Sequence, residues 1–425
     1  MKEQQINVLS NNLRLDFHCQ FETPVMQICF FTDEKASNFL PLTLTRPLDD
    51  LRLGILTIRE KWEAVLKPTS VSRILENQLK GVFDSDNISE EHCLWLNSRY
   101  LPTFDLIQQI KNLEVGDFLF EETILVAALI NDKDSLRAFE NHVIPNPDTG
   151  KTHQLNIEPD SITHFWDLLS HNAKQIKADL AHFNYSPLHK SKFATACISK
   201  NPDQIFIADS ATIEPGVILI ADNGPIFIGS EVTIEAGAIL KGPVAICKKS
   251  TVKMGAQVFG GSTVGPVCKV AGEINNVIFH SYSNKAHDGF MGNSVIGQWC
   301  NFGAGTITSN LKNNYGMVKL PHWETGNTSD EGVQFLGTIM GDHSKTAIGT
   351  TLNTGTICGV SSNILNSGFP PKVIRSFSWV SDNGVMEYRF NHAINTMRKM
   401  MERRGIELNE SYEKMMNSIF SQPNR

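Results

Sequence analysis

A six-residue repeat in the second half of the chain restricts its fold more than any other feature of the sequence. Branched apolar residues recur there at every sixth position, at Ile228, Ile234, Leu240, Ile246, Val252, Val258, Val264 and Val270. If roughly one residue in four is Ile, Leu or Val, chance gives such a run in one register with a probability on the order of 10^-5. The repeat is typical of a β-helix, in which each unit forms a short strand and a turn, and three units complete a coil.

The repeat extends over residues 205–370, with interruptions that predict projecting loops. The same register opens at Ile207 and Ile213 and changes phase after Val270. It resumes at Ile278, Phe290, Ile296 and Phe302 and, beyond a polar excursion at 310–332, at Ile348, Thr354 and Val360. Because sites are commonly built on loops that project from a regular scaffold, we expect the sites of this half in its turns and excursions.

Residues 1–200 lack this period and predict an α/β domain. The expected elements are strands at 25–31 and within 118–130, and helices at 74–79, 106–113 and 161–183. The last of these helices would connect the domain to the β-helix. Residues 371–425 form a C-terminal extension, in which 384–404 has helical periodicity and a cationic end.

Composition and charge argue against several classes of protein. The chain has 38 Lys and Arg against 45 Asp and Glu, and a formal charge of −7 without a basic block argues against nucleic-acid binding. No uncharged apolar run approaches the roughly 18 residues of a membrane span, and the polar first residues lack the pattern of a signal peptide. The 8 Cys form no CxxC pairs, as expected of buried thiols in a reducing compartment. We therefore expect a cytoplasmic protein that binds small molecules.

Two segments near residue 300 carry a specific family resemblance. Residues 285–292, KAHDGFMG, look like a KAGHxTYLG motif, and residues 301–310, NFGAGTITSN, look like an NIGAGTITCN motif. The chain thereby resembles the bifunctional glucosamine-1-phosphate N-acetyltransferase and N-acetylglucosamine-1-phosphate uridyltransferase. The resemblance implies a Rossmann-like α/β nucleotidyltransferase domain, followed by a left-handed parallel β-helix of hexapeptide repeats and a C-terminal helix. It also implies a homotrimer with acyl-transfer sites between chains.

The same resemblance implies roles for individual residues. They are His287 as the acetyltransferase base, Asn310 as a catalytic contact, Asn301, Lys285 and Glu273 as substrate contacts, and Ala304, flanked by Gly303 and Gly305, as a backbone contact to acetyl-CoA. A neutral imidazole with a pKa of about 6.5 can take a proton from an amine that attacks a thioester. The simpler alternatives are a solvated loop histidine, and glycines that serve the turns of the β-helix.

Some positions depart from the family pattern. Phe290 stands where the family has tyrosine, Asn275 where it has lysine, and Ala271 where an arginine is expected. These departures leave the acceptor sugar open, and another amino sugar is an alternative.

The N-terminal half departs further, because it has no glycine before Gly54. Ordinary sugar nucleotidyltransferases carry a glycine-rich phosphate loop after the first strand. Residues 40–47, 51–62 and 97–99 instead resemble a divergent group of sugar nucleotidyltransferases known from Bacteroidetes-type genomes. The cations expected to bind the nucleotide phosphates are Arg46, Arg52, Lys61 and Arg99. The alternative for Arg52 and Lys61 is a helix that faces solvent.

Nucleotidyl transfer implies Mg²⁺, for which Asp49, Asp50 and Asp105 are candidates without a decisive pattern. We predict a transferase that acetylates a hexosamine 1-phosphate with acetyl-CoA. It then transfers a nucleotidyl group from a nucleoside triphosphate to the N-acetylhexosamine 1-phosphate, giving UDP-N-acetylglucosamine or a related product. Two alternatives stay open: a nucleotidyltransferase with a structural or regulatory β-helix, and a non-catalytic scaffold that binds nucleotide sugars. The sequence does not choose the nucleotide or the sugar.

Overall fold

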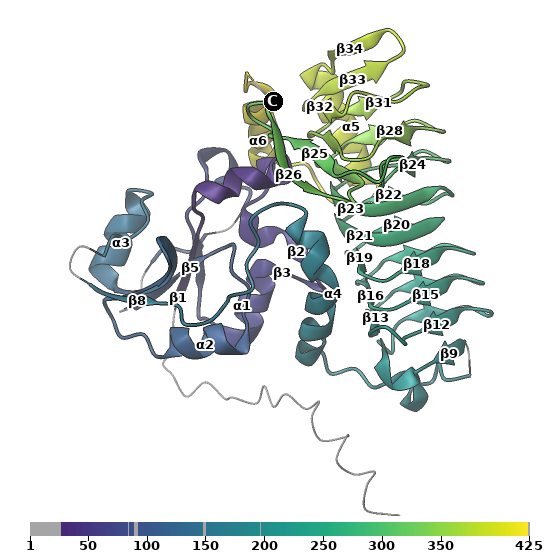
Figure 1. Cartoon of the computed structure of the whole chain (residues 1–425). Coiled ribbons are helices and arrows are strands. Elements are labelled where there is room, and N and C mark those ends of the chain that lie inside the picture. The colour runs from purple at the N-terminus through teal and green to yellow at the C-terminus, as the bar shows by residue number, and fades with distance from the viewer. Residues whose placement is uncertain (1–26, 84, 89–91, 148–149, 196, 424–425) are drawn as a thin grey trace, which may run out of the picture.

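Six strands form the sheet of the N-terminal unit (Figure 1). The computed structural model describes residues 27–83, 85–88, 92–147, 150–195 and 197–423. In spatial order the strands are β4 (Val71–Arg73), β1 (Gln27–Phe31), β5 (His92–Asn97), β7 (Ile124–Asn131), β6 (Asp117–Glu121) and β8 (Lys151–Gln154). β1 is parallel to β4 and β5, so the carboxyl ends of these three strands open on one edge of the sheet. The strand predicted at 25–31 is confirmed from Gln27, and residues 25 and 26 lie outside the described residues.

Helices and a small hairpin complete this unit. They are α1 (Ile58–Leu66), α2 (Phe104–Lys111), α3 (Asp132–Glu140), α4 (Asp167–Asp179) and the hairpin of β2 (Arg52–Leu53) and β3 (Leu56–Thr57). α2 and α4 confirm the helices predicted at 106–113 and 161–183, although α4 is shorter than predicted. The helix predicted at 74–79 is wrong, because Glu76 has extended backbone angles and only Asn77–Leu79 form a 3₁₀ turn.

The second half of the chain is a parallel β-solenoid whose strands stack in three rows. The first row contains β10 (Ile205–Ile207), β13 (Ile226–Ile228), β16 (Val244–Ile246), β19 (Ser262–Val264), β27 (Thr338–Met340), β30 (Thr356–Cys358) and β32 (Val373–Ile374). The second contains β11 (Thr212–Ile213), β14 (Thr233–Ile234), β17 (Thr251–Val252), β20 (Lys269–Val270), β22 (Asn284–Lys285), β28 (Lys345–Thr346), β31 (Asn363–Ile364) and β33 (Ser378–Ser381). The third contains β9 (Ile198–Lys200), β12 (Ile218–Ile220), β15 (Ile239–Lys241), β18 (Gln257–Phe259), β24 (Ile307–Thr308) and β29 (Thr351–Leu352). The longer β21 (Glu273–Ser281) and β23 (Phe290–Gln298) span the third and first rows.

The predicted repeat register is confirmed from Ile228 to Val270, since the eight branched residues of that run are all 0% exposed. Several predictions beyond it are wrong. Phe290 is only partly buried, because its neighbour Met291 points into the solenoid instead. Val360 belongs to the core shared with the N-terminal unit, whereas Cys358 and Ile364 lie inside the solenoid. Ile278 points out of the solenoid, because alternation along β21 directs its neighbours Val277 and Phe279 inward. Ile348 is 80% exposed because it precedes Gly349 in a turn, where the glycine has φ +68°.

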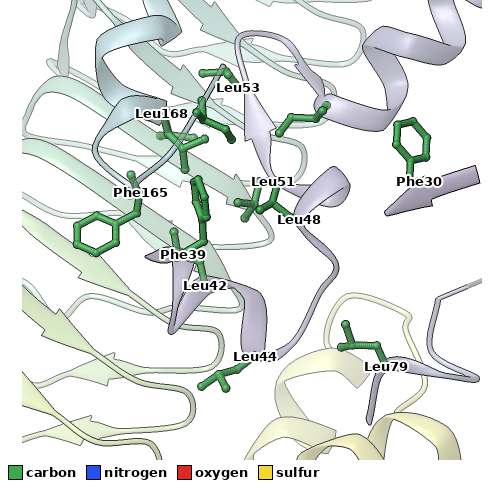
Figure 2. Packing of buried hydrophobic residues seen from close by; sticks show 14 of the residues in the cluster. Phe30, Phe39, Leu42, Leu44, Leu48, Leu51, Leu53, Leu79, Phe165 and Leu168 are labelled. Carbon is green, nitrogen blue, oxygen red and sulfur yellow. The ribbon is translucent and has the colours of Figure 1, made fainter. Parts of the chain in front are cut away.

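The two halves share one hydrophobic core. α4 lies along the first row of the solenoid, between the sheet and the strands (Figure 1). Leu51 and Leu168 from the N-terminal unit belong to the same buried cluster as Ile278 and Val295 from the solenoid. Figure 2 shows Leu51 and Leu168 together in this cluster. Each fully buried side chain of this size contributes about 1.5 to 3 kcal/mol, so the contact resembles a domain core.

A buried carboxylate joins the halves at one point of this contact. Asp342, just after β27, forms an ion pair with the guanidinium group of Arg46. The Thr45 hydroxyl donates to the same carboxylate at 2.8 Å, and the backbone N–H of Gln298 donates to it at 2.7 Å. Arg46 and Asp342 are both almost fully buried. Arg46 also pairs with Asp50 of its own half at 3.4 Å, so it is the charge of Asp342 that is compensated only while the two halves stay together.

The C-terminal segment packs against both halves. It contains the strand β34 (Gly384–Glu387), paired with β33, and the helices α5 (Phe390–Glu402) and α6 (Glu410–Phe420). The helix predicted at 384–404 thus begins only at Phe390, because residues 384–387 pair with β33. The buried face of α6 belongs to the shared core. No helix within the described residues is long and apolar enough to span a membrane.

We expect Arg46→Met to lower the free energy of unfolding by about 3 to 5 kcal/mol, because it leaves a buried carboxylate unpaired. Urea unfolding followed by tryptophan fluorescence measures this change. The double variant Arg46→Met/Asp342→Asn should recover part of the loss. Arg398→Met removes a half-exposed ion pair with Glu413 and should cost less than about 1 kcal/mol. Equal losses in Arg46→Met and Arg398→Met would contradict a buried ionic link between the halves.

Candidate active sites

A cavity of about 390 Å³ opens at the carboxyl ends of the parallel strands. Its wall includes Phe31 at the end of β1, Ile74 after β4 and Ser98 after β5. Ligands of open α/β sheets bind in the crevice outside the carboxyl ends of the strands. The solenoid contributes Trp323 and Glu324 to the same cavity. The cavity therefore lies between the two halves of the chain.

Some charged groups at this cavity are already paired within the protein. Arg46 lines the cavity while its guanidinium group is paired with Asp342. Asp49 also lines it, and its carboxylate accepts a hydrogen bond from Arg73 Nε at 2.8 Å. Neither side chain is free to bind a ligand without losing a buried partner.

Three other polar groups at the cavity are not used in this way. Glu76 and Glu324 line it, and neither has a cationic partner within the described residues. Burial raises the pKa of Glu76, and the nearby carboxylate of Glu324 raises it further. Ser98 is 1% exposed, and its hydroxyl group has no hydrogen-bond partner in the described part of the chain. These groups can interact with a ligand in the cavity.

A second cavity of about 220 Å³ adjoins the first across Trp323. The stacked rings of His164 and Trp166, with centroids 4.1 Å apart, line it. His322 also lines it, and its Nδ1 is buried without a hydrogen-bond partner among the described residues. The two cavities share Ser37, in the loop after β1.

Lys35 lies in this loop and lines the second cavity. Its backbone N–H donates to Asp33 at 3.0 Å, whereas its ammonium group has no partner within the described ranges. Lys35 was not among the predicted residues. Its position was the available signal, because it is the first cation after the strand, where the glycine-rich loop is missing.

Arg99, predicted to bind phosphate, instead holds the loop after β1. Its guanidinium group pairs with Asp33, with Nη2 and Oδ2 2.6 Å apart. Burial alone would raise the pKa of Asp33, but hydrogen bonds from Arg99 and Asn97 lower it below its usual value. Arg99 therefore positions the loop that carries Lys35.

Arg52 and Lys61, also predicted to bind phosphate, lie in the contact between sheet and solenoid. Arg52 Nε donates to the carbonyl of His280 at 3.1 Å. The ammonium group of Lys61 pairs with Asp179 at the end of α4, and burial lowers the pKa of Lys61. Arg46 is thus the one residue among the four predicted cations that lines the first cavity.

His287 lies on a turn of the solenoid between β22 and β23, and its side chain is exposed. Lys285 lies beneath this turn, 1% exposed, and its Nζ donates to the carbonyls of His287 and Asp288 at 2.9 Å each. Burial lowers the pKa of Lys285 to about 8. Lys285, predicted to contact substrate, thus supports the turn that presents His287.

The other predicted solenoid residues lie on neighbouring coils. Glu273 pairs in register with Phe290, three residues after His287. Asn310 Nδ2 donates to Asn293 Oδ1 at 2.7 Å. The backbone of Asn301 forms an isolated parallel β-bridge with Asn284. A side chain at Gly289 would meet the backbone of Thr306, so the turn of His287 stacks on the next turn. This next turn is the one that carries Gly303, Ala304 and Gly305, the predicted acyl-CoA contacts.

Most of the N-terminal unit matches a known family model. Residues 28–185 match the family model described as sugar nucleotidyl transferase. These residues are thus similar to a sugar nucleotidyl transferase domain. The resemblance inferred from the sequence is thereby confirmed for this half.

Curated relatives support the same assignment at low identity. The bifunctional protein GlmU of Methanocaldococcus jannaschii is 31% identical over 151 residues, which cover 32% of this chain and 34% of the relative. GlmU of Herminiimonas arsenicoxydans is 26% identical over 316 residues, covering 64% of this chain and 62% of the relative. The chain thus spans about a third of the length of the first of these relatives. These matches support a transferase.

A solved structure matches as well. It is a hexapeptide transferase family protein from Anaplasma phagocytophilum, 14% identical, with the match covering 52% of this chain and 91% of that chain. The TM-score of 0.19 is too low to support an inference from its structure.

The nucleotidyl transferase domain offers no ready-made magnesium site within the described residues. Asp49 is paired with Arg73, burial raises the pKa of Asp50 to about 6, and Asp105 is exposed on α2. Nowhere in the described ranges do three or more His, Cys, Asp or Glu side chains converge. The three predicted candidates therefore do not form a metal site together.

Proposed function

We propose that the chain synthesises a nucleotide sugar at the cavities beside β1 and β5. A phosphate oxygen of a sugar 1-phosphate attacks the α-phosphorus of a nucleoside triphosphate, and pyrophosphate leaves. The observation that carries this proposal is a cavity at the carboxyl edge of the sheet, in the region that matches the sugar nucleotidyl transferase model. The Ser98 hydroxyl group in this cavity and the ammonium group of Lys35 nearby have no partner among the residues that the structure describes.

Such a reaction depends chiefly on positioning and on cations around the phosphates. Lys35 is suited to this task, because its ammonium group can bind a phosphate without breaking an internal ion pair. Arg46 lines the first cavity, so its predicted phosphate contact stays a prediction. In sites of this kind Mg²⁺ is held by one or two carboxylates together with the substrate phosphates. The ion would then arrive with the nucleotide.

We propose acetyl transfer from acetyl-CoA to a hexosamine 1-phosphate as a second activity, because the imidazole of His287 is exposed on a turn that Lys285 supports. His287 would take a proton from the amine as the nitrogen attacks the thioester carbon and the thiolate of coenzyme A leaves. The stacked turn of Gly303 to Gly305 would accept the acyl-CoA. The combined product would be UDP-N-acetylglucosamine or a related nucleotide sugar.

A matrix of nucleoside triphosphates and sugar 1-phosphates, with pyrophosphate release as readout, tests the first activity. A free-thiol assay with acetyl-CoA tests the second. Pyrophosphate release alone would favour a nucleotidyltransferase with a structural solenoid. If neither assay detects a reaction but the chain still binds nucleotide sugars, a non-catalytic scaffold would be favoured.

We expect Lys35→Ala to lower kcat/KM for nucleotidyl transfer by a factor that corresponds to about 2 to 4 kcal/mol, because one phosphate cation is lost. Pyrophosphate release measures the rate, and thermal unfolding should be unchanged. Lys151→Ala is the matched control, since Lys151 is exposed on the edge strand β8. If Lys35→Ala and Lys151→Ala had equal kcat/KM values, the proposed phosphate contact of Lys35 would be wrong.

We expect His287→Ala to cut acetyl transfer by about 10²- to 10⁴-fold, the usual contribution of a general base. Its side chain is exposed, so truncation opens no core cavity and the melting temperature should not change. The free-thiol assay measures the rate, and calorimetry measures acetyl-CoA affinity, which should stay constant. A folded His287→Ala variant with a normal rate would reject the role of His287 as base.

We expect a homotrimer in solution. The first row of the solenoid packs against the N-terminal unit, which leaves the other rows for contact between chains. Ile198 and Ile307 are exposed hydrophobic side chains on the third row. Light scattering should give three times the chain mass of 47.3 kDa. A monomer at micromolar concentration would contradict the trimer and any site shared between chains.

A further inference from the structure

A β-hairpin leaves the solenoid and reaches the nucleotidyl transferase domain (Figure 1). It consists of β25 (Val318–Pro321) and β26 (Thr328–Val333), which pair in antiparallel fashion. Its turn is closed by two backbone hydrogen bonds, in which the N–H of His322 donates to the Asn327 carbonyl at 2.7 Å and the N–H of Gly326 donates to the His322 carbonyl at 2.8 Å. The two residues of interest, Trp323 and Glu324, lie in this turn.

The coils that follow hold the hairpin in place. Arg375, just after β32, lies over the ring of Trp323 at 4.9 Å from the centroid, and its guanidinium group donates to the Trp323 carbonyl. The Nζ of Lys372 donates to the carbonyl of Lys319 at 2.6 Å. Trp323 is consequently 5% exposed and forms part of the wall of both cavities.

The polar groups available in the first cavity define the chemistry of its ligand. Glu76 and Glu324 lack cationic partners in the described part of the chain, and the Ser98 hydroxyl lacks any hydrogen-bond partner there. Carboxylates accept hydrogen bonds and repel phosphate. A ligand with many hydroxyl or amino donors and an apolar face fits this wall, whereas a polyphosphate does not.

We infer that Trp323 and Glu324 of the solenoid hairpin bind the sugar ring of the sugar 1-phosphate, together with Glu76 and Ser98 of the N-terminal unit, which line the same cavity. Hydroxyl or amino groups of a hexose or hexosamine donate to the two carboxylates, and the sugar packs against the indole ring. The phosphate of the substrate then points away from the carboxylates, toward Lys35 in the adjoining cavity. This inference rests on the proposed nucleotidyl transfer and adds the binding group for its sugar.

The test uses the full chain and the variants Trp323→Ala, Trp323→Phe and Glu324→Gln. Tyr315→Ala is the control, because Tyr315 is 71% exposed in the same excursion and lines neither cavity. We expect the KM for the sugar 1-phosphate to rise about tenfold or more in Trp323→Ala and Glu324→Gln, while the KM for the nucleoside triphosphate changes less than about twofold. Trp323→Phe keeps an aromatic face and should raise the sugar KM less than Trp323→Ala.

A second measurement does not depend on catalysis. Saturation-transfer NMR with free glucosamine, N-acetylglucosamine and glucose reports binding of the unphosphorylated ring. The wild type could bind the free sugar and yet release no pyrophosphate. If Glu324→Gln then lost the sugar binding, the sugar site would be supported while the proposed nucleotidyl transfer fails.

Three results would overturn the inference. One is a wild-type chain that transfers nucleotides while Glu324→Gln keeps a normal KM for the sugar 1-phosphate. Another is an equal rise of both KM values with a lower melting temperature in Trp323→Ala and in Glu324→Gln, which would indicate a structural hairpin. The third is free-sugar binding that is identical in the wild type and in Glu324→Gln.

Discussion

The carboxylate of Asp342 sets the geometry on which both cavities depend. It lies in the solenoid, yet it accepts from Arg46 and Thr45 of the N-terminal unit and from the backbone of Gln298. Separating the halves would leave the Asp342 carboxylate without its cation, which is far more costly than loss of an exposed pair, whereas Arg46 would keep Asp50 at 3.4 Å. The relative position of sheet and solenoid is thus fixed by electrostatics as well as by the shared apolar core. A cavity between them can therefore keep a defined shape.

This use of charge explains how the domain differs from a nucleotidyltransferase with a glycine-rich loop. Glycine lets the backbone wrap around phosphates, and a chain without it must rely on side chains. Arg52, Lys61 and Arg99 serve packing and loop position instead, through contacts with His280, Asp179 and Asp33. The phosphate cation must then come from elsewhere. Lys35, on the loop that Arg99 holds, is the cation proposed for this task, since its ammonium group has no partner among the described residues and it lines the second cavity.

The sequence predicted most of what depends on local period and little of what depends on distant partners. The register from Ile228 to Val270 follows from six-residue spacing alone, and the structure confirms it. The predicted register is wrong at Ile278, because β21 continues through two rows and the alternation of side chains within this strand replaces the six-residue repeat. Arg46 has a local partner in Asp50, but its second partner, Asp342, is 296 residues away, and no local pattern could reveal it. The sequence also could not predict the cavity wall formed by Trp323, since Trp323 lies in an excursion whose composition indicates only a polar loop.

The base of that excursion connects the two proposed sites. The carbonyl of Asn310 accepts from the N–H of Leu336 at 2.9 Å and so closes the excursion, while its side chain donates to Asn293 beside the coil of His287. The segment from Asn301 to Glu324 thus supplies residues to the proposed acetyl-transfer turn and to the proposed sugar wall. A solenoid that lost acetyl transfer would still be needed to carry Trp323. A structural role of the solenoid and a catalytic one are therefore not exclusive, because one coil would present His287 while later coils anchor the hairpin through Arg375 and Lys372.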